Sequence, residues 1–135
     1  MDVETTTYNK GNAFDSRNKL VSIHAHDGSQ SWSFKPAQVD EIRELVQKAT
    51  LIIGFNFKFD IHWLRKLGIS FVGKKIYDVQ LAHYYLTNQS HKLPSLDEVL
   101  TIHGLPVKVD KVKAYWDQGY QTDQIPWEDL CEYGE

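Results

Sequence analysis

The chain has 135 residues, a length that fits one domain built on a single core. Apolar residues make up 41% of the chain and aromatic residues 13%, which excludes a disordered polypeptide. With 15 basic and 18 acidic residues, the formal charge of −3 excludes a protein that coats nucleic acid by counterion release alone.

The N-terminal third predicts strands followed by a helix. After a short first strand, residues 5–19 are rich in Thr, Asn, Asp and Gly and predict a loop. Two alternating stretches, 20–27 and 31–34, flank a turn and predict a β-hairpin, whose first strand is half-buried with its serine and histidines on the open face. Residues 36–49 have apolar side chains at helical spacing, which predicts an amphipathic helix with Pro36 in its first turn.

The middle of the chain alternates strands with helices. Residues 50–56 are almost wholly apolar, which predicts a strand buried on both faces. Asn56 is then expected to be the N-cap of a helix over 57–68. Residues 75–77 predict a further short strand, which runs into a helix capped by Asp78.

The C-terminal part predicts two more helices with an irregular segment between them. The first is a capped helix over 94–104, and the last helix begins at Pro126. The order of elements indicates an α/β fold with its antiparallel strands first. Residues 105–125 are basic and aromatic, and are either a solvated loop or a segment that follows a single-stranded backbone through Lys108, Lys111, Lys113, Tyr115 and Trp116.

Three acidic residues stand where such a sheet gathers functional side chains: Asp2 and Glu4 on the first strand, and Asp60 early in the helix after the fourth. Residues two apart on a strand project from one face, so Asp2 and Glu4 point together. Their charges repel unless a cation lies between them, and carboxylate oxygens suit Mg²⁺ or Mn²⁺. Taken alone, such a pair is more often a solvated strand end than a ligand set.

In combination, the segments DVET and NFKFD resemble the first two motifs of the DEDD 3′-to-5′ exonucleases, and CEYGE supplies the tyrosine of the third. Nearly the whole chain is similar to the proofreading exonuclease domain of family A DNA polymerases. The resemblance implies a ribonuclease H-like mixed sheet, antiparallel strands first and then parallel strands, with helices on both faces. It also implies a two-metal site for Mg²⁺ or Mn²⁺ on Asp2, Glu4 and Asp60.

The resemblance further implies roles for residues around the metal site. Tyr133 would complete the catalytic set by orienting the attacking water. Tyr8, Asn56 and Thr5 would bind substrate. Tyr8 would stack against terminal bases, and Asn56 would contact the end of the substrate strand.

In this family apolar residues precede the first aspartate, and an aspartate follows the tyrosine of the third motif four places later. Here Met1 alone precedes Asp2, and that aspartate would fall beyond Glu135. We therefore expect one exonuclease-like domain over 1–135 that is cut short at both ends and is itself weakly active or inactive.

The function implied is metal-dependent removal of 3′-terminal nucleotides from DNA, as the proofreading part of a DNA polymerase. Its partners would be the 3′ end of single-stranded DNA and the polymerase domain of the same parent chain. Two alternatives stay open: an RNase D-like exonuclease acting on RNA, and a catalytically dead nucleic-acid binding module. The lone Cys131, and the lack of a signal peptide or a long apolar run, predict a cytoplasmic protein of bacterial or phage type with no membrane partner.

Overall fold

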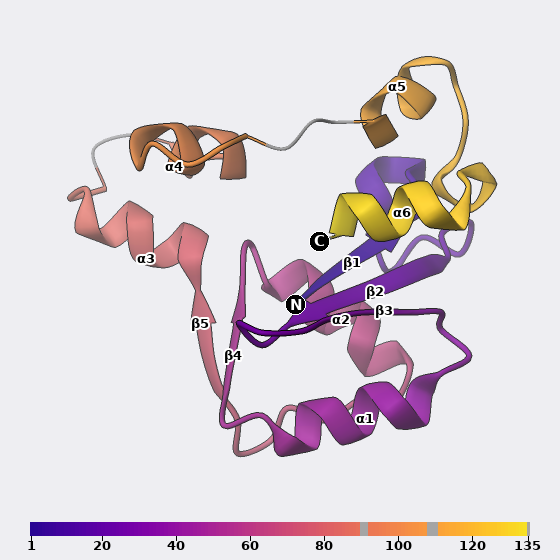
Figure 1. The fold of residues 1–135 in the computed structure, drawn as a ribbon, viewed down its shortest axis with the longest axis horizontal. Coiled ribbons are helices and arrows are strands. Elements are labelled where there is room, and N and C mark those ends of the chain that lie inside the picture. The colour runs from indigo at the N-terminus through magenta and orange to yellow at the C-terminus, as the bar shows by residue number, and fades with distance from the viewer. Residues whose placement is uncertain (90–91, 108–110, 135) are drawn as a thin grey trace.

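The protein folds into two small sheets with helices on both sides (Figure 1). The computed structural model describes residues 1–89, 92–107 and 111–134. An antiparallel sheet has the order β1-β2-β3, and β4 pairs in parallel with β5. This mixed architecture confirms the predicted ribonuclease H-like α/β fold. The strands are β1 (Asp2–Thr5), β2 (Leu20–His26), β3 (Ser31–Phe34), β4 (Leu51–Gly54) and β5 (Lys75–Asp78).

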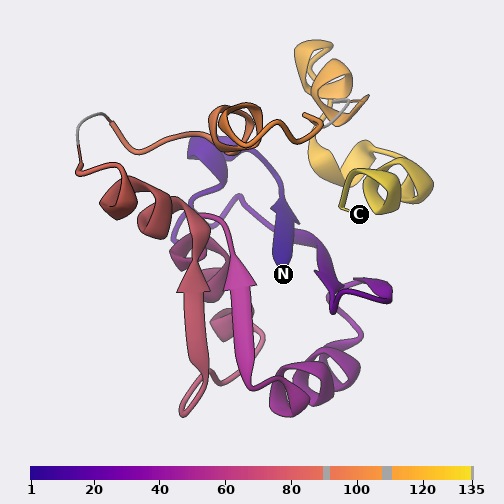
Figure 2. The same cartoon turned by 60° about the vertical axis from the view of Figure 1, so that its left-hand side comes forward.

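The two sheets meet along β1 and β4. The N-terminal amino group of Met1 donates a 2.9 Å hydrogen bond to the carbonyl oxygen of Ile53 on β4. In Figure 2, β1, β4 and β5 point the same way, so their carboxyl ends lie at one end of the molecule. In open α/β sheets this end is where ligands bind.

Helices cover both faces of the antiparallel sheet. On one face, α1 (Val39–Lys48) and α2 (Lys58–Lys66) enclose the main apolar core, with Ile23 of β2 completely buried in it. A second cluster lies under α5 (Lys111–Asp117) and α6 (Trp127–Gly134). The remaining elements are η1 (Tyr8–Gly11), α3 (Val79–Leu86), α4 (Leu96–Ile102) and η2 (Thr122–Gln124). Within the described ranges, no helix has the length and apolarity that crossing a membrane requires.

Strand β2 is buried on both faces, which corrects the expectation of a half-buried strand. Ser22 and His24 lie beneath α6, and the His24 ring contacts the hydroxyl oxygens of Ser33 at 2.9 Å and Ser22 at 2.8 Å. A Cβ atom added to Gly134 of α6 would overlap that ring. The close approach of α6 therefore hides a polar face that looked open in the sequence.

A β-bulge in β2 breaks the predicted alternation. Glu4 lies opposite Ser22 while Thr5 lies opposite Leu20, so Val21 is the extra residue. The bulge turns Leu20 toward the main core and Val21 toward the cluster under α6. Val21 and Ile23 therefore do not share a core, although they are two residues apart.

Strand β4 is not buried on both faces as predicted. Ile52 is buried, but Leu51 and Ile53 are 48% and 50% exposed. Within the described residues β4 pairs only with β5, and the face that carries Leu51 and Ile53 stays open to solvent. An apolar run alone does not distinguish these two environments.

The start of α1 and the structure of the segment 105–125 also differ from the sequence-based expectation. Helix α1 begins at Val39 after the N-cap Gln38, so Pro36 precedes the helix; the amide of Gln38 instead donates to the carbonyl of Lys35 in a turn. The segment 105–125 is not irregular, because it contains α5 and η2. Of its basic residues, Lys108 lies outside the described residues.

Candidate active site

Asp60 and Asp2 form a carboxyl pair beside β1. Asp60 lies in the first turn of α2 and is only 2% exposed, whereas Asp2 begins β1 and is exposed. The backbone amide of Val3 donates a 2.9 Å hydrogen bond to Oδ1 of Asp60. Burial, and next the negative charge of the neighbouring Asp2, raise the pKa of Asp60 to about 8. The structure thus buries the carboxyl group of Asp60 next to that of Asp2.

This donor set fits a divalent cation. Both donors are carboxylates, the ligands that Mg²⁺ and Mn²⁺ prefer, and a positive ion between Asp2 and Asp60 would offset their repulsion. The bond from Val3 also fixes the orientation of the Asp60 carboxylate, as outer hydrogen bonds commonly do for metal ligands.

Glu4 lies near the pair but does not complete a trio. By register it shares the face of Asp2, since Asp2 lies opposite His24 and Glu4 opposite Ser22. Two residues of strand separate the acids by about 7 Å. Among the described residues, no group of three or more His, Cys, Asp or Glu side chains is placed to hold a metal ion. The structure thus assembles Asp2 with Asp60, whereas Glu4 would have to turn toward them.

Tyr133 reaches the site region on α6. The neighbouring Gly134 lies against His24, the residue opposite Asp2, so the end of α6 covers the face from which Asp2 and Glu4 project. The Tyr133 ring is half-buried and meets Trp116 edge-on, with ring centroids 6.3 Å apart. Packing therefore holds this tyrosine on α6, the helix that covers the face of Asp2 and Glu4.

Asn56 does not cap α2, which corrects that prediction. It has a left-handed backbone with φ of 53°, a conformation that Asn tolerates, and the N-cap is Phe57 without a side-chain bond. Instead, the Asp78 carboxylate accepts the amide hydrogens of Asn56 at 3.1 Å and Phe57 at 2.9 Å. It also caps its own helix α3 through Gln80 and Leu81, as predicted.

Asp78 thus joins the starts of α2 and α3, at the carboxyl ends of β4 and β5. The sequence signalled only the local cap, because a bond to Asn56 depends on how the two strands pair. Since α2 carries Asp60 in its first turn, Asp78 is part of the support for the carboxyl pair.

The other expected substrate-binding residues differ in accessibility. Thr5 is buried, its hydroxyl donates to the carbonyl of Thr6, and its own carbonyl accepts a 2.7 Å bond from the Thr122 hydroxyl. Tyr8 is 40% exposed and carries the Arg17 guanidinium 5.3 Å from its ring centroid. Of these two residues, only Tyr8 presents its side chain to solvent.

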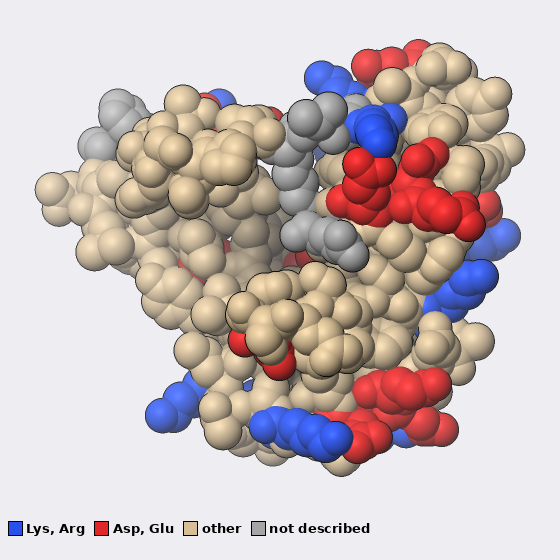
Figure 3. Space-filling model, viewed as in Figure 1, with Lys and Arg blue, Asp and Glu red and all other residues tan. Residues whose placement is uncertain are grey.

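Lys111 and the aromatic side chains of α5 contact α6. Helix α6 carries an acidic patch of Glu128, Asp129 and Glu132, which Figure 3 shows in red over this helix. Lys111 pairs with Glu132 at 2.6 Å, and the Tyr115 hydroxyl donates to Asp129 at 2.8 Å. These contacts favour a structural role for this segment over contact with a nucleic-acid backbone.

The comparisons with known proteins agree with the fold. Residues 1–135 match the family model described as 3′-5′ exonuclease. No curated protein and no solved structure matches the chain. Because the family match covers the entire chain, the protein belongs to the 3′-5′ exonuclease family.

Proposed function

We propose that this domain removes 3′-terminal nucleotides from DNA with the help of Mg²⁺ or Mn²⁺, as the proofreading part of a DNA polymerase. The observation that supports the proposal most is the buried Asp60 held beside Asp2 in a chain of the exonuclease family. The partners in this proposal are the 3′ end of single-stranded DNA and a polymerase domain of the same parent chain, and the reaction takes place in the cytoplasm.

Asp2 and Asp60 would hold the metal ions, and Glu4 would add a carboxylate by turning toward them. When bound, such ions activate water and stabilise the charge that develops on the phosphate oxygens. Asp60 is oriented in advance by the amide of Val3, so little reorganisation of this ligand is needed.

The chain's own side chains would orient the reacting groups. A water oxygen attacks the phosphorus of the terminal phosphodiester, while the bond from phosphorus to the 3′ oxygen of the penultimate nucleotide breaks. That 3′ oxygen takes up a proton, and a nucleoside 5′-monophosphate leaves. We assign Tyr133 the task of holding the attacking water through its phenol oxygen, and Tyr8 that of stacking on a base near the 3′ end.

A single-turnover assay tests the proposal. DNA and RNA strands of one sequence, labelled at the 5′ end, are incubated with excess protein and Mn²⁺, so that slow cleavage is also registered. We expect the DNA to shorten from its 3′ end one nucleotide at a time and faster than the RNA. Asp60→Asn should slow this roughly thousandfold, about 4 kcal/mol at the transition state. Asp40→Asn, at an exposed position of α1, is the matched control and should cleave normally.

Other outcomes would contradict the proposal. Faster degradation of RNA would favour the RNase D-like alternative. Binding of both strands without metal-dependent cleavage would favour a binding module. Cleavage that Asp60→Asn leaves unchanged would remove the carboxyl pair from the reaction.

A further inference from the structure

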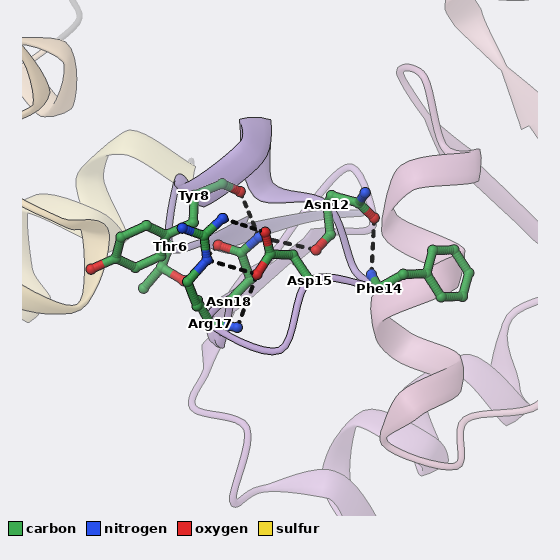
Figure 4. A network of polar contacts seen from close by, with 7 residues as sticks. All are labelled: Thr6, Tyr8, Asn12, Phe14, Asp15, Arg17 and Asn18. Atoms are coloured by element: carbon green, nitrogen blue, oxygen red, sulfur yellow. Dashed lines mark hydrogen bonds and ion pairs between the residues drawn. The ribbon is translucent and has the colours of Figure 1, made fainter.

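The loop that follows β1 is held rigidly by its own side chains (Figure 4). Asn18, which is buried, accepts a 3.1 Å bond from the Thr6 hydroxyl. Its amide nitrogen donates to the carbonyl oxygens of Tyr8 at 2.6 Å and Asn12 at 3.0 Å. The indole nitrogen of Trp63 on α2 donates to the carbonyl of Gly11 at 3.1 Å. The backbone that carries Tyr8 is therefore tied to the core.

The side chain of Arg17 is oriented by Asp15 in the same loop. The Asp15 carboxylate accepts bonds from Nε of Arg17 at 3.0 Å and from its NH2 group at 2.7 Å, a two-point contact that fixes the plane of the guanidinium. The Asp15 side chain is 14% exposed and that of Arg17 is 63% exposed. Asp15 thus holds the guanidinium through Nε and one NH2 group, while much of the Arg17 side chain remains in solvent.

The held guanidinium lies over the ring of Tyr8. Its central carbon is 5.3 Å from the ring centroid, within the range of a cation–π contact. In Figure 4 the tyrosine hydroxyl points away from the loop, and Tyr8 as a residue is 40% exposed. The ring therefore has a fixed cationic neighbour, while part of the tyrosine is accessible to solvent.

The Tyr8 ring lies within reach of a DNA strand whose 3′ end is bound at Asp2. Six residues separate Tyr8 from Asp2, so the two are at most about 20 Å apart. At about 3.4 Å per nucleotide in a stacked strand, that distance spans the last few nucleotides.

We propose that Arg17 is a positioning residue, which fixes the Tyr8 ring as a platform for one of the last bases at the 3′ end of the substrate. The inference rests on the proposed function and extends it to a residue that the catalytic motifs do not include. The cation–π contact holds the tyrosine in one orientation before the strand arrives, so less side-chain freedom is lost on binding.

The test is a binding measurement in EDTA, where no cleavage occurs. The probe is a single-stranded DNA with 2-aminopurine at its last, second-last or third-last position, whose fluorescence falls on stacking. Tyr8→Ala should weaken binding by roughly 5- to 100-fold and abolish quenching at one of these positions. Arg17→Ala should weaken binding by about 2- to 10-fold and reduce the same quenching. Adding Arg17→Ala to Tyr8→Ala should have no further effect.

Two controls separate positioning from simple charge. Arg17→Lys keeps the charge but not the planar two-point contact with Asp15, so it should bind as weakly as Arg17→Ala. Arg43→Ala removes another arginine–aspartate pair, with Asp40 on α1, and should bind like the unaltered chain. Normal thermal unfolding of each variant would show that it is folded.

The proposal would be overturned if the effects of Tyr8→Ala and Arg17→Ala were additive, or if Arg17→Lys restored binding, since Arg17 would then act on phosphate by its own charge. It would also be overturned if no probe position were quenched. These results are separate from the failure of the proposed function: a chain that shows the coupling but never cleaves DNA contradicts only the latter.

Discussion

The backbone amide of Val3 donates to the buried carboxylate of Asp60 at 2.9 Å, across 57 residues of sequence. Since Val3 pairs with Ile23 on its other side, this bond attaches the first turn of α2 to the edge of β1 that does not pair with β2. The residue before Val3 is Asp2, so the same contact sets the two acids next to each other. This backbone group thus holds the Asp60 carboxylate beside Asp2.

Asp78 is expected to stabilise the starts of helices α2 and α3, which follow β4 and β5. Asp78→Ala leaves four amide hydrogens without their acceptor, so we expect the free energy of unfolding to fall by about 2–3 kcal/mol in urea denaturation. Asp78→Asn keeps one acceptor oxygen and should lose only about 1 kcal/mol. Equal losses in both variants would show that the carboxylate does not link the two helix starts.

Gly134 is expected to be required for the packing of α6 on β2. Gly134→Ala places a methyl group into the His24 ring, and we expect a loss of about 1–3 kcal/mol in the free energy of unfolding. Adding His24→Ala removes the overlap, so the double variant should lose less than the sum of the two single variants. Additive losses would mean that α6 does not approach His24 closely.

Tyr133 tests the assignment of the third motif. Tyr133→Phe keeps the ring that packs against Trp116 but removes the phenol oxygen. We expect the single-turnover rate of 3′ cleavage to fall by about 10- to 100-fold in a chain that remains folded, because the oxygen that would hold the attacking water is removed. Tyr115→Phe, which removes a hydroxyl bonded to Asp129 instead, is the control and should cleave at the normal rate. A normal rate in Tyr133→Phe would reduce this residue to a packing role.

The Asp15–Arg17 contact predicts an acid-sensitive pair. Arg17 lowers the pKa of Asp15 from its usual 3.8 to about 2. A lowered pKa means that the contact is fully present above about pH 4 and is lost as the pH falls toward 2. NMR titration of the Asp15 carboxyl carbon should follow this range, and Arg17→Ala should return the midpoint toward the usual value. An Asp15 that titrates near 3.8 in the unaltered chain would mean that the pair does not form in solution.

Much of the fold follows from local patterns in the sequence. The hairpin of β2 and β3 is encoded by alternation around a turn, and the caps at Asp78 and Ser95 by side chains that accept nearby amides. These signals depend on neighbours in the chain, so they can be read without knowing the tertiary structure. The motif residues Asp2 and Asp60 were found through the order of such elements.

The remaining features depend on contacts between distant segments. The bulge at Val21 and the burial of His24 arise from how β1 and α6 pack on β2, and no local pattern encodes them. In the same way, Asp78 and not Asn56 accepts the amide hydrogens before α2. It can do so because β4 and β5 pair in the register that sets Gly54 beside Asp78. The cation–π contact between Arg17 and Tyr8 has no signature in sequence spacing, so the sequence does not indicate a role for Arg17.

Binding of Mn²⁺ to the chain, measured by calorimetry with Asp60→Asn and the control Asp40→Asn, tests the central claim that Asp2 and Asp60 form a metal-holding pair. Asparagine keeps an oxygen that can accept the bond from Val3, so the metal-free variant should unfold at the same temperature as the unaltered chain or higher. We expect the affinity for Mn²⁺ to fall at least about tenfold in Asp60→Asn and to stay unchanged in Asp40→Asn. Mn²⁺ should raise the unfolding temperature of the unaltered chain and of Asp40→Asn. The rise should be much smaller for Asp60→Asn. Equal affinity of Asp60→Asn and the unaltered chain for Mn²⁺ would contradict the account.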